Sequence, residues 1–263
     1  TVSRPGPVRR NGGAVMGRYR YDGSFEGYLS TLCLALAERD EAVEFVRDAP
    51  ETEPGLFDGP AIAVVTDKGE AAAFRERFAA EVSQEAFSML CYAFHSEREG
   101  IENLLWQYVR LGLQAGPRLC SMIADKRVNR VDRLARAVSR EAHRYKGFVR
   151  FRELDEGFLY ARIEPEAHII RFLAPHFARR VGDRPWVIHD LRRSVAAVYD
   201  LAGWRLMHDI TLTGSPRFTG VEEGWAGLWR SYFRRLAVEE RRNPKLQQKL
   251  VPLRSRKYLV EFE

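Results

Sequence analysis

The sequence predicts an α+β protein with a helical N-terminal half, a mostly antiparallel sheet in the C-terminal half and a closing C-terminal helix. Three observations support this prediction. From about residue 69 to residue 146 the apolar residues recur at spacings of three and four, as in amphipathic helices. From Phe148 the period changes to two, and strand-like runs with short connections follow up to residue 212. From Thr219 the spacing is helical again.

Short elements open the folded part of the chain. Residues 19–21 form a strand-like run, and Asp22-Gly23 is a turn signal. Ser24 can cap the helix that follows, because its hydroxyl can accept a hydrogen bond from an unpaired backbone N–H. Residues 45–46 and 61–65 are two further strand candidates, joined by a loop rich in Pro, Gly and acidic residues.

The strongest helix signal covers residues 121–146. Its apolar positions recur at spacings of four and three and make one buried stripe of Ala124, Val128, Val131, Ala135, Val138, Ala142 and Tyr145. Gly147 is expected to end this helix in the left-handed conformation, which glycine adopts at little cost. Lys146 would then lie at the negative end of the helix dipole, where a cation is favourable.

The pattern after Gly147 predicts a sheet. Two strand-like runs, 148–154 and 158–164, flank the turn Asp155-Glu156-Gly157 and predict a hairpin. The remaining predicted elements are a helix over 165–177, strands over 186–190, 194–200 and 204–212, and a last helix from Thr219 that stops at Asn243-Pro244.

Composition bounds the class of protein. The chain has 263 residues, of which 45% are hydrophobic and 30% are charged, as in ordinary globular proteins. Residues 1–15 are rich in Arg, Pro and Gly and lack the apolar stretch of a signal peptide, so we expect a disordered leader. Residues 16–263 are expected to form a single α+β domain. A subdivision near 116–147 would separate a helical part, 16–147, from a sheet-containing part, 148–263.

The apolar runs and the cysteines bear on location. No apolar run approaches the roughly 18 residues that a membrane span requires. The three cysteines, Cys33, Cys91 and Cys120, are widely spaced and fit a reducing compartment. We therefore expect a cytoplasmic protein with no membrane partner.

Charge is unevenly distributed along the chain. Residues 21–102 hold 6 basic and 18 acidic residues, a net charge of −12. Residues 103–152 hold 12 basic and 3 acidic residues, a net charge of +9. Residues 230–257 hold 10 basic and 2 acidic residues, a net charge of +8. Two basic blocks beside an acidic one favour a polyanionic partner, and we expect DNA.

One face of the predicted 121–146 helix is basic. Opposite its apolar stripe lie Lys126, Asn129, Arg133, Arg136, Arg140 and Arg144, at spacings of 3, 4, 3, 4 and 4. Lys146 follows, and Arg150 and Arg152 are expected to continue the charge on one face of the next strand. Such a row could track a phosphate backbone. The alternatives are a solvated helix face, or docking onto the acidic segment of the same chain or onto an acidic partner.

A second group of basic candidates lies near the C-terminus. Arg241, Arg242 and Lys245 are interleaved with Asn243 and a following pair of glutamines, and amide side chains can bond phosphates or base edges. A flexible basic tail would have the same composition.

Several stretches together carry a family resemblance. YDGSFEG (21–27), HRYKGFVRF (143–151), HFARRVGDRPWVIHD (176–190) and ERRNPKLQ (240–247) resemble a bacterial domain-of-unknown-function family over about residues 17–250. Members of that family are described as DNA repair or DNA metabolism proteins. They are typically encoded beside a radical-SAM protein similar to spore photoproduct lyase, and some are fused to a domain of the uracil-DNA glycosylase superfamily. The resemblance implies a DNA repair context and supplies no catalytic residues.

Candidates for acid–base chemistry are few. Asp22, His143 and Asp190 are the best of them, and each also has a structural interpretation: a turn former, a surface histidine and a turn cap. The sequence contains no spacing typical of a metal site and no nucleotide-binding signature, so we expect neither a metal nor a cofactor.

The sequence therefore predicts a DNA-binding protein of repair or DNA metabolism, acting as an accessory or lesion-recognition partner of a separate radical-SAM repair enzyme. A uracil-DNA glycosylase-like protein is a second expected partner. Two alternatives stay open: a DNA-processing enzyme in its own right, such as a glycosylase or nuclease, and a protein–protein adaptor whose basic face meets an acidic surface.

Overall fold

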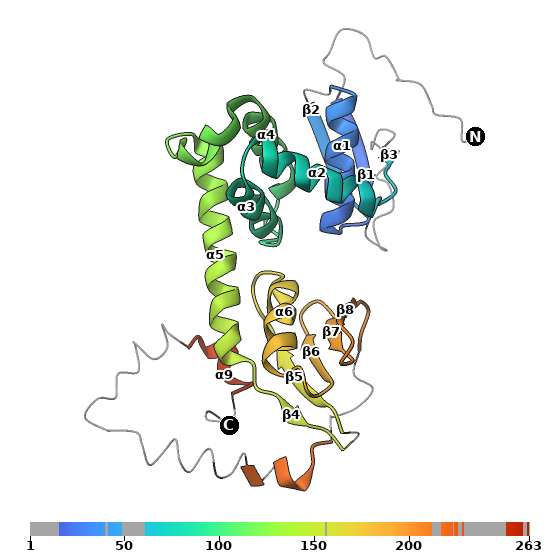
Figure 1. Ribbon diagram of the computed structural model, residues 1–263, viewed down its shortest axis with the longest axis vertical. Coiled ribbons are helices and arrows are strands. Elements are labelled where there is room, and N and C mark those ends of the chain that lie inside the picture. Colours follow the sequence, from blue (N-terminus) through green and yellow to red (C-terminus); the bar gives the residue numbers. More distant parts are fainter. Residues whose placement is uncertain are drawn as a thin grey trace, which may run out of the picture. The chain divides into compact units, whose positions relative to one another are not determined.

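The computed structural model describes residues 16–39, 42–48, 61–155, 157–211, 217–222, 224–225, 228, 251–259 and 262. The chain divides into two compact units, one ending at Arg136 and the other beginning at Ala137 (Figure 1). Helices prevail in the N-terminal unit and a mixed sheet lies in the C-terminal unit, which confirms the α+β prediction.

The N-terminal unit combines a small parallel sheet with helices. Its strands have the order β2-β1-β3, with Tyr19 of β1 paired to Phe45 of β2 and to Ile62 of β3. Its elements are β1 (Met16–Tyr21), α1 (Phe25–Ala37), β2 (Ala42–Arg47), β3 (Ile62–Ala63), α2 (Lys68–Glu81), α3 (Gln84–Phe94), α4 (Ile101–Ala115) and the 3-10 helix η1 (Gly116–Ser121). Helix α1 is the crossover that parallel pairing of β1 with β2 requires.

Local capping explains where these helices start. The side chains of Ser24, Asp67 and Ser83 each accept a hydrogen bond from a backbone N–H in the first turn of α1, α2 and α3, respectively. The predicted cap at Ser24 is thereby confirmed.

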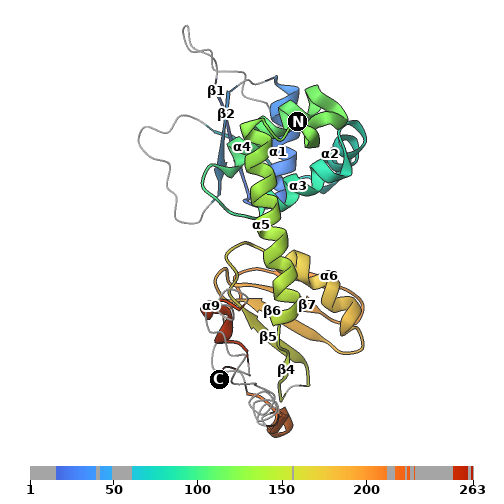
Figure 2. The same ribbon diagram turned by 90° about the vertical axis from the view of Figure 1, so that its left-hand side faces the viewer.

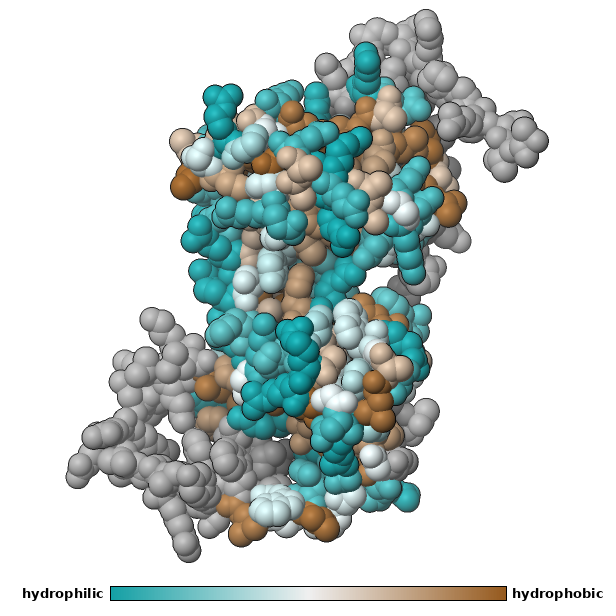
Figure 3. Space-filling model, in the orientation of Figure 1, coloured by the Kyte–Doolittle hydropathy of each residue, from teal (hydrophilic) through white to brown (hydrophobic). Residues whose placement is uncertain are grey.

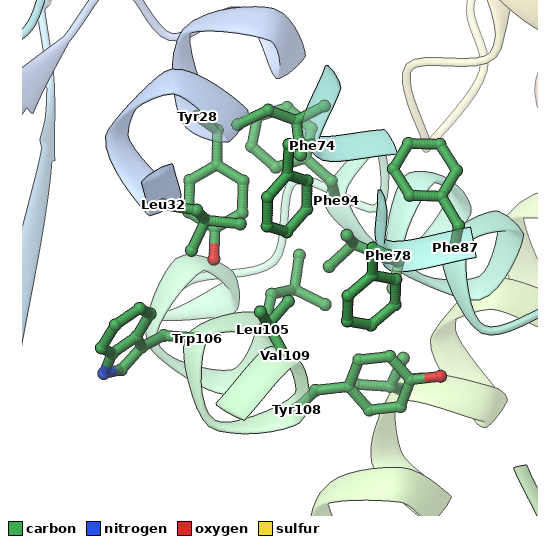
Figure 4. Close-up of a cluster of buried hydrophobic side chains, with 14 of the residues drawn as sticks. Tyr28, Leu32, Phe74, Phe78, Phe87, Phe94, Leu105, Trp106, Tyr108 and Val109 are labelled. Atoms are coloured by element: carbon green, nitrogen blue, oxygen red, sulfur yellow. The ribbon is translucent and has the colours of Figure 1, made fainter. Parts of the chain in front are cut away.

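Aromatic side chains dominate the core of this unit. Tyr28 stacks on Phe94 with ring centroids 5.3 Å apart, and Phe74 stacks on Phe78 at 5.7 Å. Figure 4 shows these rings with Leu32, Leu105 and Val109 filling the space between the helices. Large rings bury much apolar area per residue, and this area stabilises the unit.

Helix α5 (Lys126–Phe148) contributes to the core of the N-terminal unit and continues into the C-terminal unit. Val128, Val131 and Ala135 belong to the core of the N-terminal unit, and the remaining members of the predicted stripe, Val138, Ala142 and Tyr145, are also buried. The stripe is confirmed except for Ala124, which is exposed and precedes the helix.

Both predicted ends of this helix are wrong. The helix starts at Lys126 instead of Ser121, because Asp125 caps it through the Arg127 backbone N–H at 2.8 Å. Gly147 does not adopt a left-handed conformation, since positive φ among the described glycines occurs at Gly23, Gly100, Gly116 and Gly157. Helical hydrogen bonding continues beyond Gly147, because the Val149 N–H donates to the Tyr145 carbonyl at 3.0 Å.

The C-terminal unit holds a five-stranded sheet of order β4-β5-β6-β7-β8. Its elements are β4 (Arg152–Glu153), β5 (Leu159–Ile163), α6 (Ile170–Arg180), β6 (Trp186–Asp190), β7 (Val195–Tyr199), β8 (Trp204–Met207) and α9 (Leu253–Arg256). Pairing is antiparallel except between β5 and β6, which α6 connects. Gly157, with φ of 83°, forms the turn of the predicted hairpin. Its first strand is shorter than predicted, because α5 continues to Phe148.

The predicted closing helix is described only at its start. The Glu222 backbone N–H donates to the Thr219 hydroxyl at 3.2 Å, which is the expected capping bond. The rest of this helix, its predicted stop at Asn243-Pro244 and the predicted leader lie outside the described residues.

Candidate nucleic-acid interface

The basic face of α5 consists of Lys126, Arg133, Arg136, Arg140 and Arg144, and each of these residues is exposed. Their opposite neighbours on the helix are the buried stripe, so packing fixes which way the cations point. In the space-filling view the residues gathered over α5 are mostly hydrophilic (Figure 3). The structure therefore brings together the five α5 cations that the sequence placed on one face.

One cation of this face is already neutralised. Arg136 Nε donates to Asp132 Oδ1 at 2.8 Å, four residues earlier on the helix. This hydrogen bond raises the pKa of Arg136 further above its usual value. Like charges four residues apart on a helix repel each other, and Asp132 weakens this repulsion between Arg136 and Arg140. Arg140 and Arg144 remain the close like-charged pair.

Three further candidates lie in the last turn of α5 and just after it, and they do not continue the row as predicted. Lys146 is half-buried on the last turn of the helix. Arg150 lies before β4 instead of on a strand, and its Nη1 donates to the Gly147 carbonyl at 2.5 Å. The Arg152 guanidinium lies 3.7 Å from the Phe218 ring centroid, and its Nε is buried. Because the helix extends to Phe148, Arg150 and Arg152 do not alternate along one strand.

The C-terminal basic candidates, Arg241, Arg242 and Lys245, lie outside the described residues.

Asp22 is a turn residue with its carboxylate engaged. Its Oδ1 accepts hydrogen bonds from the Ser24 backbone N–H at 2.9 Å and hydroxyl at 2.6 Å, and its Oδ2 accepts from the Thr66 hydroxyl at 2.7 Å. Burial alone would raise the pKa of Asp22, but the hydrogen bonds from Ser24 and Thr66 lower it overall. Asp22 is therefore ionised and ties the turn after β1 to the segment before α2.

Asp190 is fully buried at the end of β6 and forms an ion pair with Arg193. Its Oδ2 accepts from Arg193 Nη1 at 2.9 Å, and its Oδ1 accepts from the Arg192 backbone N–H at 3.1 Å. Burial raises the pKa of Asp190, although the Arg193 charge acts against this rise. The Arg193 guanidinium in turn donates to the carbonyls of Pro165 and Glu166. Asp190 thus positions Arg193, whose hydrogen bonds hold the segment before α6 in place.

Glu141 of α5 binds the same segment before α6. It is 4% exposed, and its two carboxylate oxygens accept the backbone N–H groups of Glu166 and Ala167 at 2.9 Å each. Glu141 was not among the residues predicted from the sequence. The signal in the sequence that could have identified Glu141 as a buried residue is its place beside Ala142, on the apolar side of α5.

His143, the third catalytic candidate, is exposed on α5. A different histidine, His189, is buried and fully hydrogen-bonded. Its Nε2 lies 3.2 Å from the Ile210 carbonyl, which can only accept, so Nε2 carries the proton and the Tyr160 hydroxyl donates to Nδ1 at 2.9 Å. Burial lowers the pKa of His189 and raises that of Tyr160 to about 12. Tyr160 is therefore a core residue.

Two kinds of feature are absent from the described residues. No group of three or more His, Cys, Asp or Glu side chains there could hold a metal ion. Within the same part of the chain, no helix combines the length and the apolar character that crossing a bilayer requires.

Comparison with known proteins identifies a family. Residues 99–261, more than half of the chain and including all of α5, match the family described as a domain of unknown function, DUF4130. Neither the curated proteins nor the solved structures provide a match. The chain therefore belongs to the DUF4130 family of domains of unknown function.

Proposed function

We propose that this protein binds DNA through the basic face of α5. In this proposal it serves DNA repair or DNA metabolism as an accessory or lesion-recognition partner of a separate radical-SAM repair enzyme. The observation that carries DNA binding is the exposure of five cations along one face of a single helix. The repair context rests on the family resemblance of the motifs in residues 143–151 and 176–190.

The dimensions of the face suit a phosphate backbone. Lys126 and Arg144 are 18 residues apart, which is about 27 Å along a helix. Phosphates of one DNA strand follow each other at about 3.4 Å along the axis, so several lie within reach of this face. Arginine and lysine on a rigid helix can meet them with little ordering of the backbone.

The catalytic candidates favour the accessory role over an enzyme of its own. Asp22 and Asp190 are both occupied by hydrogen bonds that hold neighbouring segments. These contacts support structural roles for the two carboxylates.

The test is a binding and turnover experiment with the full chain. Fluorescently labelled single-stranded, duplex and damaged duplex DNA are titrated at low and at physiological salt. We expect binding to at least one form, weaker at the higher salt, with every DNA recovered unchanged. Absence of binding at low salt would contradict the proposal. Conversion of damaged DNA would favour the enzyme, and salt-insensitive capture of a protein partner without DNA affinity would favour the adaptor.

A further inference from the structure

Four basic side chains from two separate motifs gather in the C-terminal unit. Lys146 lies on the last turn of α5, and His176, Arg179 and Arg180 lie on the C-terminal half of α6. Spacings of three and four place the α6 residues on one side of that helix. Both ribbon views show the C-terminal half of α5 next to α6 (Figures 1 and 2).

Aromatic packing fixes this arrangement. Phe151, which follows α5, contacts Phe177 of α6 edge-on with centroids 5.2 Å apart. The same ring lies 6.0 Å from that of Trp186 on β6. The stretches HRYKGFVRF and HFARRVGDRPWVIHD therefore meet in one core, and residues at the edge of this core carry the four basic groups.

His176 has an unusual environment within this group. Its Nε2 is shielded from solvent and has no hydrogen-bond partner among the described residues. The charges that act on its ring, those of Lys146, Arg180 and Arg179, are all positive. Burial, and after it these three charges, lower the pKa of His176 below its usual value.

Helix capping explains only part of the cluster. Arginines in the last turn of α6 are favourable beside the negative end of its dipole, and this accounts for Arg179 and Arg180. It does not account for the positive charge that Lys146, from another helix, adds at the His176 ring. A bound anion would offset this excess positive charge.

We infer that Lys146, His176, Arg179 and Arg180 form a phosphate-binding site. This inference rests on the proposed function, because the phosphate would be a group of the DNA that the basic face of α5 contacts. The arginines and the lysine donate to the phosphate oxygens, and the phosphate offsets the positive charge that acts on the His176 ring. The phosphate is an internal diester or a terminal monoester, which share this chemistry.

Phosphate binding at this site predicts proton uptake. In the free protein His176 is neutral near pH 7, because its pKa lies below the usual value. A phosphate dianion or monoanion beside the ring favours the protonated form and raises this pKa. Affinity for DNA should therefore increase as the pH falls from about 7.5 toward 6. The charged groups that act on His176 are Lys146 of α5 and Arg179 and Arg180 of α6.

The experiment follows the histidine ring by NMR in the full chain. The pKa of His176 is measured alone, with inorganic phosphate, and with short oligonucleotides that carry either a 5′-phosphate or a 5′-hydroxyl. We expect the pKa of His176 to lie below the usual value for histidine in the free protein and to rise on adding oligonucleotide. An equal rise with both oligonucleotides identifies a diester, and a rise confined to the phosphorylated one and to inorganic phosphate identifies a monoester.

Variants separate this inference from the proposed function. His176→Gln should abolish the pH dependence of DNA affinity, whereas His208→Gln, on an exposed residue, should keep it. Arg179→Gln with Arg180→Gln should lower the slope of log K against log salt by about 1.8 for duplex DNA, and Arg75→Gln in the N-terminal unit should not change it. DNA binding with an unmoved His176 pKa and unchanged variants would overturn this inference alone. No DNA binding at all would overturn the proposed function, and a shift with inorganic phosphate alone would then mark a free-phosphate site.

Discussion

Replacing Arg133, Arg140 and Arg144 together by glutamine removes three cations from the exposed face of α5. Arg136 is left in place, because Asp132 already neutralises it. Glutamine keeps the helix propensity of arginine, so the helix itself should be unaffected.

The magnitude follows from the number of phosphates that the three arginines neutralise. Removing one such cation lowers the slope of log K against log salt by about 0.9 for duplex DNA, so removing three lowers it by about 2.7. Between 50 and 200 mM salt, affinity of the unmodified protein should then fall about 40-fold more than that of the variant. The unfolding free energy should stay within about 0.5 kcal/mol, with a small gain from relieving the Arg140–Arg144 repulsion.

The assay is fluorescence anisotropy across this salt range, together with urea denaturation of both proteins. A matched pair of single variants serves as the control: Arg140→Gln should lower the slope by more than Arg136→Gln, since only Arg136 has a carboxylate partner four residues away. An unchanged slope in a folded triple variant would refute DNA contact by this face. Unfolding of the triple variant would show that the face packs against protein.

Three further predictions concern the fold. Gly147→Ala should raise the unfolding free energy by about 0.5–1 kcal/mol in urea denaturation, because this glycine is inside α5 and a Cβ there meets open space; a loss of stability would show a left-handed Gly147 after all. Glu141→Gln should lower the unfolding free energy by about 1–3 kcal/mol, since an amide cannot accept both N–H groups of Glu166 and Ala167. The control, Asp183→Asn on an exposed residue, should have little effect. Equal stability of the two variants would contradict this role of Glu141. The folded pKa of Asp22 is lowered, so its contribution is present above its ordinary pKa and is lost as the pH falls through the folded value. Acid titration of stability should therefore be shallower below about pH 4 in Asp22→Asn than in the unmodified protein, and identical titrations would show that Asp22 is not engaged.

Elements with a clear period could be predicted from the sequence. Residues 186–190 coincide with β6, and the runs at 194–200 and 204–212 contain β7 and β8. Short apolar runs bounded by turn residues are a local property of the sequence, so these strands can be identified without tertiary contacts. The stripe from Val128 to Tyr145 could be predicted for the same reason.

Helix ends were harder to predict from the sequence, because they depend on single hydrogen bonds. Ala124 continues the apolar spacing, yet the cap at Asp125 starts α5 after it. Gly147 fits a helix end by composition, yet nothing in the sequence shows that the backbone bond from Val149 to Tyr145 passes it. Boundaries of this kind commonly differ by a few residues.

Some features of the candidate site could also be predicted from the sequence, and others could not. Exposure of Lys126, Arg133, Arg140 and Arg144 follows from helix geometry and could be predicted. The ion pair of Arg136 with Asp132 was not predicted, although the spacing of four residues between them on a helix was the available signal. The roles of Asp190 and Glu141 could not be predicted, because both depend on the segment at 165–167, which lies far from them in sequence.

The most direct test of DNA binding by α5 is the salt dependence of the unmodified protein on one duplex. Four cations of the basic face, Lys126, Arg133, Arg140 and Arg144, are exposed and should each contribute about 0.9. The account predicts that log K falls linearly with log salt, with a slope of at least about 3.6 in magnitude. A slope near zero, or no measurable binding at low salt, would contradict it.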